Sequence, residues 1–130
     1  MIGYVTLGTN DIMRIAAFYD ELLGGLGAKR LMEMPHVILW GLPGQPMLGV
    51  IRPHNGQPAT VGNGTMVSLS AGSREDVDRM HARALALGGT DEGAPGERFK
   101  GFYAGYWRDI DGNKLNFFHI GGLSACPRCC

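Results

Sequence analysis

The sequence repeats itself at an interval of 62 residues, and this repeat limits the folds available to the chain more than any other feature. Residues 4–7 (Tyr-Val-Thr-Leu) align with residues 66–69 (Met-Val-Ser-Leu), and both segments have the apolar alternation of a strand. Gly27 falls on Gly89, each at the end of an apolar helical pattern. A fixed interval of this kind indicates two copies of one supersecondary unit.

Each copy contains one amphipathic helix after its first strand. Apolar residues recur at three- and four-residue steps over about residues 11–26 and again over about residues 74–87. Thr9 or Asn10 is expected to cap the first helix, and Ser73 is expected to cap the second. Two helices of similar length therefore occupy equivalent places in the repeat.

Three short strands are predicted after each helix, so that each copy is a βαβββ module. The strands are expected near residues 29–34, 37–42, 46–52, 90–93, 102–109 and 114–120. Asp111-Gly112 is typical of a two-residue type I′ hairpin turn. The predicted fold class is α+β, with two βαβββ modules that form a curved, cup-like mixed sheet and helices outside.

The chain divides into a domain over residues 1–120 and a tail over residues 121–130. Within the domain, the first module covers about residues 1–53, a linker rich in Gly, Pro and Asn covers 54–63, and the second module covers about 64–120. Cys126, Cys129 and Cys130 all fall in the tail, where they suit either a zinc or disulfide site or no site at all. We interpret the tail as lying outside the fold.

Charge and hydropathy exclude several classes of partner. Lys plus Arg and Asp plus Glu number 12 each, so no basic surface is expected to recruit nucleic acid. The apolar runs are too short to span a membrane. The first residues enter a strand pattern directly without a leader pattern, so we expect a cytoplasmic protein.

Two segments of the chain are similar to those of a known superfamily. Residues 4–12 and 17–23 combine an aliphatic strand, an Asp-Ile turn and a Phe-Tyr helix, and residues 106–115 contain an Asp-Gly-Asn hairpin. In this order and spacing the chain resembles the vicinal oxygen chelate superfamily. It includes glyoxalase I, bleomycin- and fosfomycin-resistance proteins and extradiol dioxygenases. The resemblance spans residues 2–120 and also implies a homodimer.

In the enzymes of that superfamily, four inward side chains bind one divalent metal ion. Carried over by the resemblance, the first-strand positions fall on Tyr4 and Met66, and the last-strand positions fall on Asn116 and near Gly49, with Ile51 as the other option. Divalent ions such as zinc and nickel prefer imidazole and carboxylate ligands. We therefore expect no metal and no cofactor, which casts doubt on glyoxalase or dioxygenase chemistry.

Period-two alternation predicts which strand residues face the inside of the cup. The expected lining mixes apolar and polar side chains, as suits a small organic ligand: Tyr4, Thr6, Met66, Ser68, Asn116 and Phe118. The same cup could instead be filled by its own side chains. The segment 93–103 is expected to be a loop over the cup, where Arg98 or Lys100 meets an anionic ligand and Tyr103 stacks on it, or a solvated hairpin whose aromatic side chains pack locally.

Three hypotheses follow for the function. The leading one is a metal-independent small-molecule binder, similar to resistance proteins that sequester drugs. The second is a glyoxalase-like or dioxygenase-type enzyme, with atypical metal ligands or with metal-free acid–base chemistry around Tyr4. The third is a non-catalytic interaction protein whose cup is filled.

Overall fold

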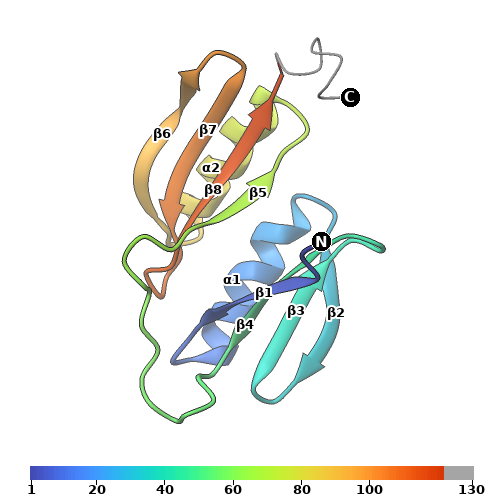
Figure 1. The fold of residues 1–130 in the computed structure, drawn as a ribbon, viewed down its shortest axis with the longest axis vertical. Coiled ribbons are helices and arrows are strands. Elements are labelled where there is room, and N and C mark those ends of the chain that lie inside the picture. The colour runs from blue at the N-terminus through green and yellow to red at the C-terminus, as the bar shows by residue number, and fades with distance from the viewer. Residues whose placement is uncertain (122–130) are drawn as a thin grey trace. The chain divides into compact units, whose positions relative to one another are not determined.

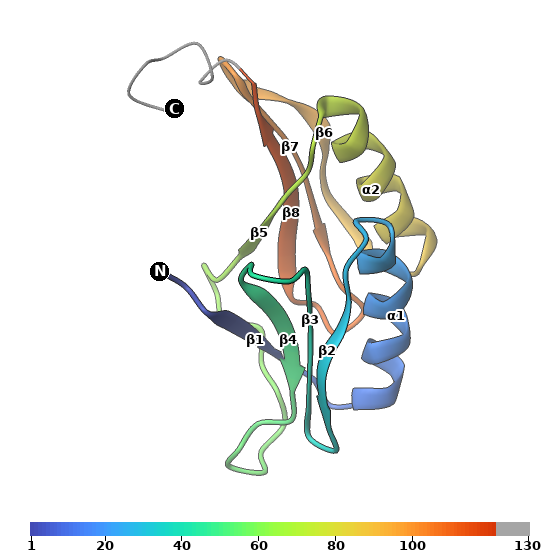
Figure 2. The same cartoon turned by 90° about the vertical axis from the view of Figure 1, so that its right-hand side faces the viewer.

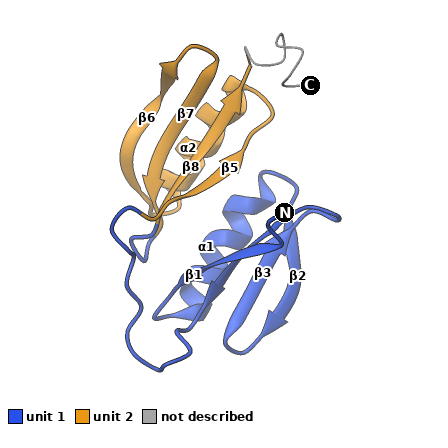
Figure 3. Cartoon of the chain, viewed as in Figure 1, with its two compact units in different colours: residues 1–64, 110–113 blue, residues 65–109, 114–130 orange. Residues whose placement is uncertain are grey.

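The computed structural model describes residues 1–121 of the chain, which form two compact units (Figures 1 and 3). Unit 1 comprises residues 1–64 and 110–113, and unit 2 comprises residues 65–109 and 114–121. The short segment 110–113 belongs to unit 1, where the Asn113 side-chain amide donates to the carbonyl oxygen of Gly8 at 3.0 Å.

Unit 1 is a four-stranded mixed sheet with one helix. Its elements run in the order β1 (Tyr4–Gly8), α1 (Ile12–Gly24), β2 (Lys29–Met34), β3 (Val37–Gly41) and β4 (Met47–Ile51). The strand order in the sheet is β1-β4-β3-β2, in which β1 and β4 are parallel and the other pairs are antiparallel. In the sequence, α1 lies between the parallel strands β1 and β4, as expected because parallel strands need a long crossover connection.

Unit 2 repeats this arrangement. Its elements are β5 (Val67–Ser70), α2 (Arg74–Ala86), β6 (Thr90–Phe99), β7 (Phe102–Arg108) and β8 (Lys114–Ile120). The strand order is β5-β8-β7-β6, again with a parallel first pair. The predicted α+β class with two βαβββ modules is therefore confirmed, and each module has its own four-stranded sheet.

Each helix covers one face of its own sheet and leaves the other face without a helix (Figure 2). In unit 1 the apolar side of α1 packs on alternate residues of β3 and β4, as period-two patterning requires. The buried side chains that form this core are Leu7, Ile15, Tyr19, Leu22, Ile38, Trp40, Leu48 and Val50. In unit 2 the equivalent core includes Val77, Met80, Trp107, Leu115 and Phe117.

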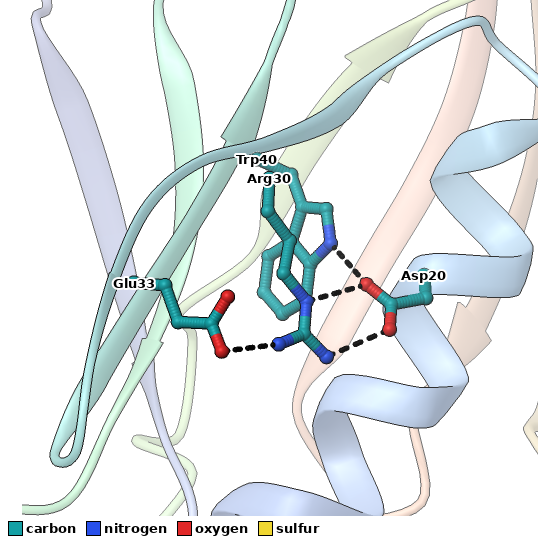
Figure 4. Close-up of polar contacts among 4 residues, drawn as sticks. All are labelled: Asp20, Arg30, Glu33 and Trp40. Carbon is teal, nitrogen blue, oxygen red and sulfur yellow. Dashed lines mark hydrogen bonds and ion pairs between the residues drawn. The ribbon is translucent and has the colours of Figure 1, made fainter.

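A polar cluster joins α1 to the sheet of unit 1 (Figure 4). The guanidinium of Arg30 on β2 donates two hydrogen bonds to the carboxylate of Asp20 on α1, at 2.8 and 2.7 Å. The indole N–H of Trp40 on β3 donates to the same carboxylate at 2.8 Å, and Glu33 pairs with the other side of the guanidinium at 3.0 Å. One carboxylate thus links the helix to two strands.

The caps of the two helices differ in how well they follow the sequence pattern. Ser73 caps α2, and its hydroxyl accepts from the Asp76 N–H at 3.1 Å, as predicted. The cap of α1 is Asp11 rather than Thr9 or Asn10. Asn10 instead accepts from the Ala59 N–H at 2.7 Å, and Thr9 accepts from the Asp11 N–H. Asn10, one of the two predicted caps, thus binds a backbone N–H that is 49 residues away in the sequence.

The structure decides two local predictions in the second module. Of the two alternatives for segment 93–103, the hairpin is confirmed and the loop is wrong, because β6 runs through to Phe99 and pairs with β7 across three register shifts. The turn at Asp111-Gly112 is not of type I′, since only Gly112 has a positive φ. Five residues, 109–113, separate β7 from β8.

Neither helix in residues 1–121 is long and apolar enough to cross a membrane, each having 13 residues. Cys126, Cys129 and Cys130 lie outside the described residues.

Candidate functional site

The helix-free face of unit 2 carries a row of polar side chains across three strands. In the strand register, Ser68 of β5 lies opposite Asn116 of β8, which in turn lies opposite Tyr106 of β7. The Ser68 hydroxyl donates to the Asn116 side-chain oxygen at 2.5 Å. Asn116 is only 1% exposed, so this hydrogen bond fixes a polar group at the centre of the face.

A stack of three aromatic rings lies beside this row. The Phe118 ring is parallel to that of Phe102, with centroids 5.9 Å apart, and Phe102 stacks on Phe99 at 4.7 Å. Phe99 is 64% exposed. An exposed ring at the end of an ordered stack offers a flat apolar surface to a ligand.

The structure brings four of the sequence-predicted residues to this face. Ser68, Asn116 and Phe118 share it by strand alternation, whereas Met66 lies just before β5 and outside the strand. Arg98 of β6 also reaches it, because its guanidinium lies 5.3 Å from the centre of the Tyr106 ring. These residues form the candidate site.

Tyr4 and Thr6 lie on the helix-free face of unit 1, where both are exposed. They pair in register with Met47 and Gly49 of β4. Gly49 therefore occupies in unit 1 the place that Asn116 occupies in unit 2. A side chain at Gly49 would meet the Leu39 methyl at 2.1 Å, so Leu39 fills the space where a last-strand ligand would project.

The side chains at the positions where the resemblance places metal ligands are not those that divalent cations prefer. Tyr4 offers a phenol, Met66 a soft thioether, and Asn116 an amide whose oxygen already accepts from Ser68. Gly49 has no side chain, and Ile51, the other option, is aliphatic. Among residues 1–121, no three His, Cys, Asp or Glu side chains cluster as metal ligands would.

Tyr103 lies on the opposite face of the sheet from Asn116. Its hydroxyl donates to the Asp78 carboxylate on α2 at 2.6 Å, and the Arg74 guanidinium lies 5.0 Å from the centre of its ring. The hydrogen bond to Asp78 holds the pKa of Tyr103 above its usual value of 10.0. This placement separates Tyr103 from the face that carries the other candidates.

Sequence reasoning missed Tyr106 and Lys114, although both lie on the candidate face. Lys114 shares the parity of Asn116 along β8, so alternation alone could have placed it. Tyr106 needed the register of β7 on β8, which depended on the connection between the two strands.

A groove of about 770 Å³ in unit 1 holds none of the predicted site residues. It lies on the helix side, where its floor is formed by Ile12, Ala16 and Ile38, all buried. Arg30 and Glu33 on its wall pair with each other. These contacts are those of a helix packed on a sheet, and we place the candidate site on unit 2.

Comparison with known proteins gives a consistent match. The family model described as Glyoxalase/Bleomycin resistance protein/Dioxygenase superfamily matches residues 1–117. A glyoxalase/bleomycin resistance protein from Albidiferax ferrireducens T118 is 41% identical, with a TM-score of 0.84 over 92% of this chain and 98% of the other. No curated protein matches.

Two more distant structures show the same fold. A glyoxalase/bleomycin resistance protein/dioxygenase family enzyme from Burkholderia phytofirmans PsJN is 20% identical, with a TM-score of 0.74 over 91% of this chain and 97% of the other. A lactoylglutathione lyase from Agrobacterium tumefaciens is 23% identical, with a TM-score of 0.69 over 91% and 92%.

Proposed function

Because the chain belongs to the glyoxalase/bleomycin resistance protein/dioxygenase superfamily, we propose that it binds a small organic molecule without a metal ion. The proposed site is the helix-free face of unit 2. Sequestration of a compound, as in the resistance proteins of the superfamily, needs a binding surface and no catalytic group. The relatives' names alone do not choose between binding and catalysis, so the proposal depends on the residues of this face.

The observation that carries the proposal is the buried hydrogen bond between Ser68 and Asn116 beside the aromatic stack. Small-molecule sites combine apolar and aromatic walls with a few fixed polar groups that orient the ligand. Here Asn116 is held by Ser68, so its orientation is set before a ligand arrives. Within residues 1–121, its amide N–H₂ makes no hydrogen bond.

Metal-independent binding follows from the donor set at the superfamily's metal positions. Protein purified without chelators is expected to contain far less than one equivalent of nickel, zinc, iron or manganese by elemental analysis. Dialysis against a chelator is expected to leave its melting temperature unchanged, because a bound ion would stabilise the native state. One equivalent of any of these metals, with a melting temperature that falls on chelation, would refute metal independence.

Ligand binding is testable by thermal shift with a library of small organic compounds. A ligand present at about 100 times its dissociation constant stabilises the native state by about 2.7 kcal/mol. In a Ser68→Ala variant, the same compound should raise the melting temperature by less than in the wild type, because Ser68 no longer orients Asn116. The matched control is Ser70→Ala on the same strand and face, whose shift should equal that of the wild type.

The possible outcomes separate the hypotheses. If no compound raises the melting temperature, a face covered by a protein partner is favoured over a small-molecule site. Equal losses in the Ser68 and Ser70 variants would also reject the proposal, since Ser70 makes no hydrogen bond to Asn116.

A further inference from the structure

Two cationic side chains converge on one aromatic ring of the candidate face. The Arg98 guanidinium carbon lies 5.3 Å from the centre of the Tyr106 ring, and the Lys114 ammonium lies 5.6 Å from it. The cations come from different strands, β6 and β8, on either side of Tyr106 in β7. Each is within the distance at which a cation is attracted to a ring face.

Neither cation has an acidic partner within residues 1–121. The Arg98 guanidinium donates to the backbone carbonyl of Ala94 at 2.6 Å, and Lys114 makes no hydrogen bond or ion pair there. The neighbouring Arg108, by contrast, is paired with Glu92 at 2.8 Å. Two positive charges therefore lie near the same ring without an acidic partner in the described residues, although the whole chain has no net charge.

Along β8, the charge of Lys114 and the aromatic ring of Phe118 lie on opposite sides of Asn116. Lys114, Asn116 and Phe118 follow each other at alternate positions of β8, so about 7 Å of strand separates each from the next. A ligand with a charged group over Tyr106 would thus reach the ring of Phe118 with a body of one or two aromatic rings. The amide of Asn116 lies between the two.

We infer that the ligand of this face is a small aromatic anion, whose carboxylate, sulfonate or phosphate is bound by Arg98 and Lys114. This inference rests on the proposed function and narrows it to one class of compound. Charge-assisted hydrogen bonds from two cations hold such an oxyanion more strongly than neutral donors would. The ring of Tyr106 positions both cations, and the stack of Phe118, Phe102 and Phe99 receives the aromatic body.

A pair of fluorescent probes tests the inference. 1-Anilinonaphthalene-8-sulfonate is an aromatic anion, and N-phenyl-1-naphthylamine has the same ring system without the sulfonate. Fluorescence titration at low salt should show that the wild-type protein binds the anion about tenfold more tightly than the neutral probe. The preference should weaken as salt is added, because the two cations are partly exposed.

The informative variant is Arg98→Gln/Lys114→Gln, which removes both charges and should abolish the tenfold preference while leaving the affinity for the neutral probe unchanged. The matched control is Arg14→Gln/Lys29→Gln, which removes two exposed charges from unit 1. It changes the net charge by the same amount. It should keep the preference for the anionic probe, because neither residue belongs to the candidate face. Circular dichroism and the melting temperature establish that both variants fold.

Each outcome decides one proposal or both. If both probes bind equally well to the wild type and to the Arg98/Lys114 variant, the anion inference is overturned and small-molecule binding stands. If the control variant loses the preference as well, the effect is one of net charge and the inference is again overturned. If neither probe binds, the proposed function and the inference fall together.

Discussion

Replacement of Gly89 by alanine is expected to lower the free energy of unfolding by about 3 kcal/mol, near the upper end of the usual cost of overpacking. Gly89 connects α2 to β6, and a Cβ there would lie 2.8 Å from the carbonyl oxygens of both Ala84 and Arg108. Both obstacles are backbone atoms, so neither a rotamer change nor a small side-chain shift relieves the contact. The helix end or β7 must move instead.

Two other glycines are controls for this prediction. Gly88→Ala should cost about 1–2 kcal/mol, because φ at Gly88 is +111° and a side chain is strained there. Gly24→Ala should be neutral or stabilising by up to about 1 kcal/mol, since Gly24 ends α1 and a Cβ would meet nothing within 4 Å. Urea denaturation measures all three, and a Gly89 variant as stable as the Gly24 variant would contradict the prediction.

Replacement of Asp20 by alanine is expected to destabilise the protein by about 1–2 kcal/mol. Most of this cost comes from Trp40, which is 1% exposed and whose indole N–H loses its acceptor. The ion pair with Arg30 adds less than about 1 kcal/mol, because the Asp20 side chain is 41% exposed and solvent screens the pair. The expected readout is a lower urea midpoint.

Two variants separate the contributions. Asp20→Asn keeps an oxygen that accepts from Trp40 and loses only the charge, so it should cost less than Asp20→Ala. Glu33→Ala removes a carboxylate that is 62% exposed and should change the stability by no more than about 0.5 kcal/mol. If the alanine and asparagine variants of Asp20 were equally stable, the assignment of the cost to the Trp40 N–H would be wrong.

The same carboxylate predicts a pH dependence. The hydrogen bonds from Arg30 hold the pKa of Asp20 below its usual value of 3.8, and the Trp40 N–H and the charge of Arg30 act in the same direction against burial. A carboxylate whose pKa is lowered by folding stabilises the protein above its unfolded-state pKa, and the contribution is lost as the pH falls through the folded-state value. The stability difference between wild type and Asp20→Asn should therefore be constant at neutral pH and shrink below pH 3.8.

Much of the fold was predictable because it depends on local periodicity. The strands at residues 29–34 and 114–120 have the predicted bounds, and both helices lie within two residues of the predicted range. The repeat also has a structural meaning, since Thr6 pairs with Gly49 as Ser68 pairs with Asn116. Yet the aligned glycines differ in role: Gly27 has a φ of +81°, whereas Gly89 is needed for close backbone approach.

The candidate site was predictable only in part. Alternation placed Ser68, Asn116 and Phe118 on one face, because alternate side chains of a strand always share a face. Tyr103 was expected near them, but β7 turns it toward Asp78 on α2. Tyr103 also belongs to the predicted strand 102–109, and its parity on β7, opposite to that of Tyr106, puts it on the helix side.

The amino-acid sequence by itself determined the two βαβββ modules and the common face of Ser68, Asn116 and Phe118. These properties depend on residue identity and on short repeating patterns. Only the tertiary structure decided that Leu39 fills the space beside Gly49, that Asp11 caps α1, and that Arg98 and Lys114 meet at Tyr106. Each of these depends on strand register or on a contact between residues distant in the sequence, which no local pattern encodes.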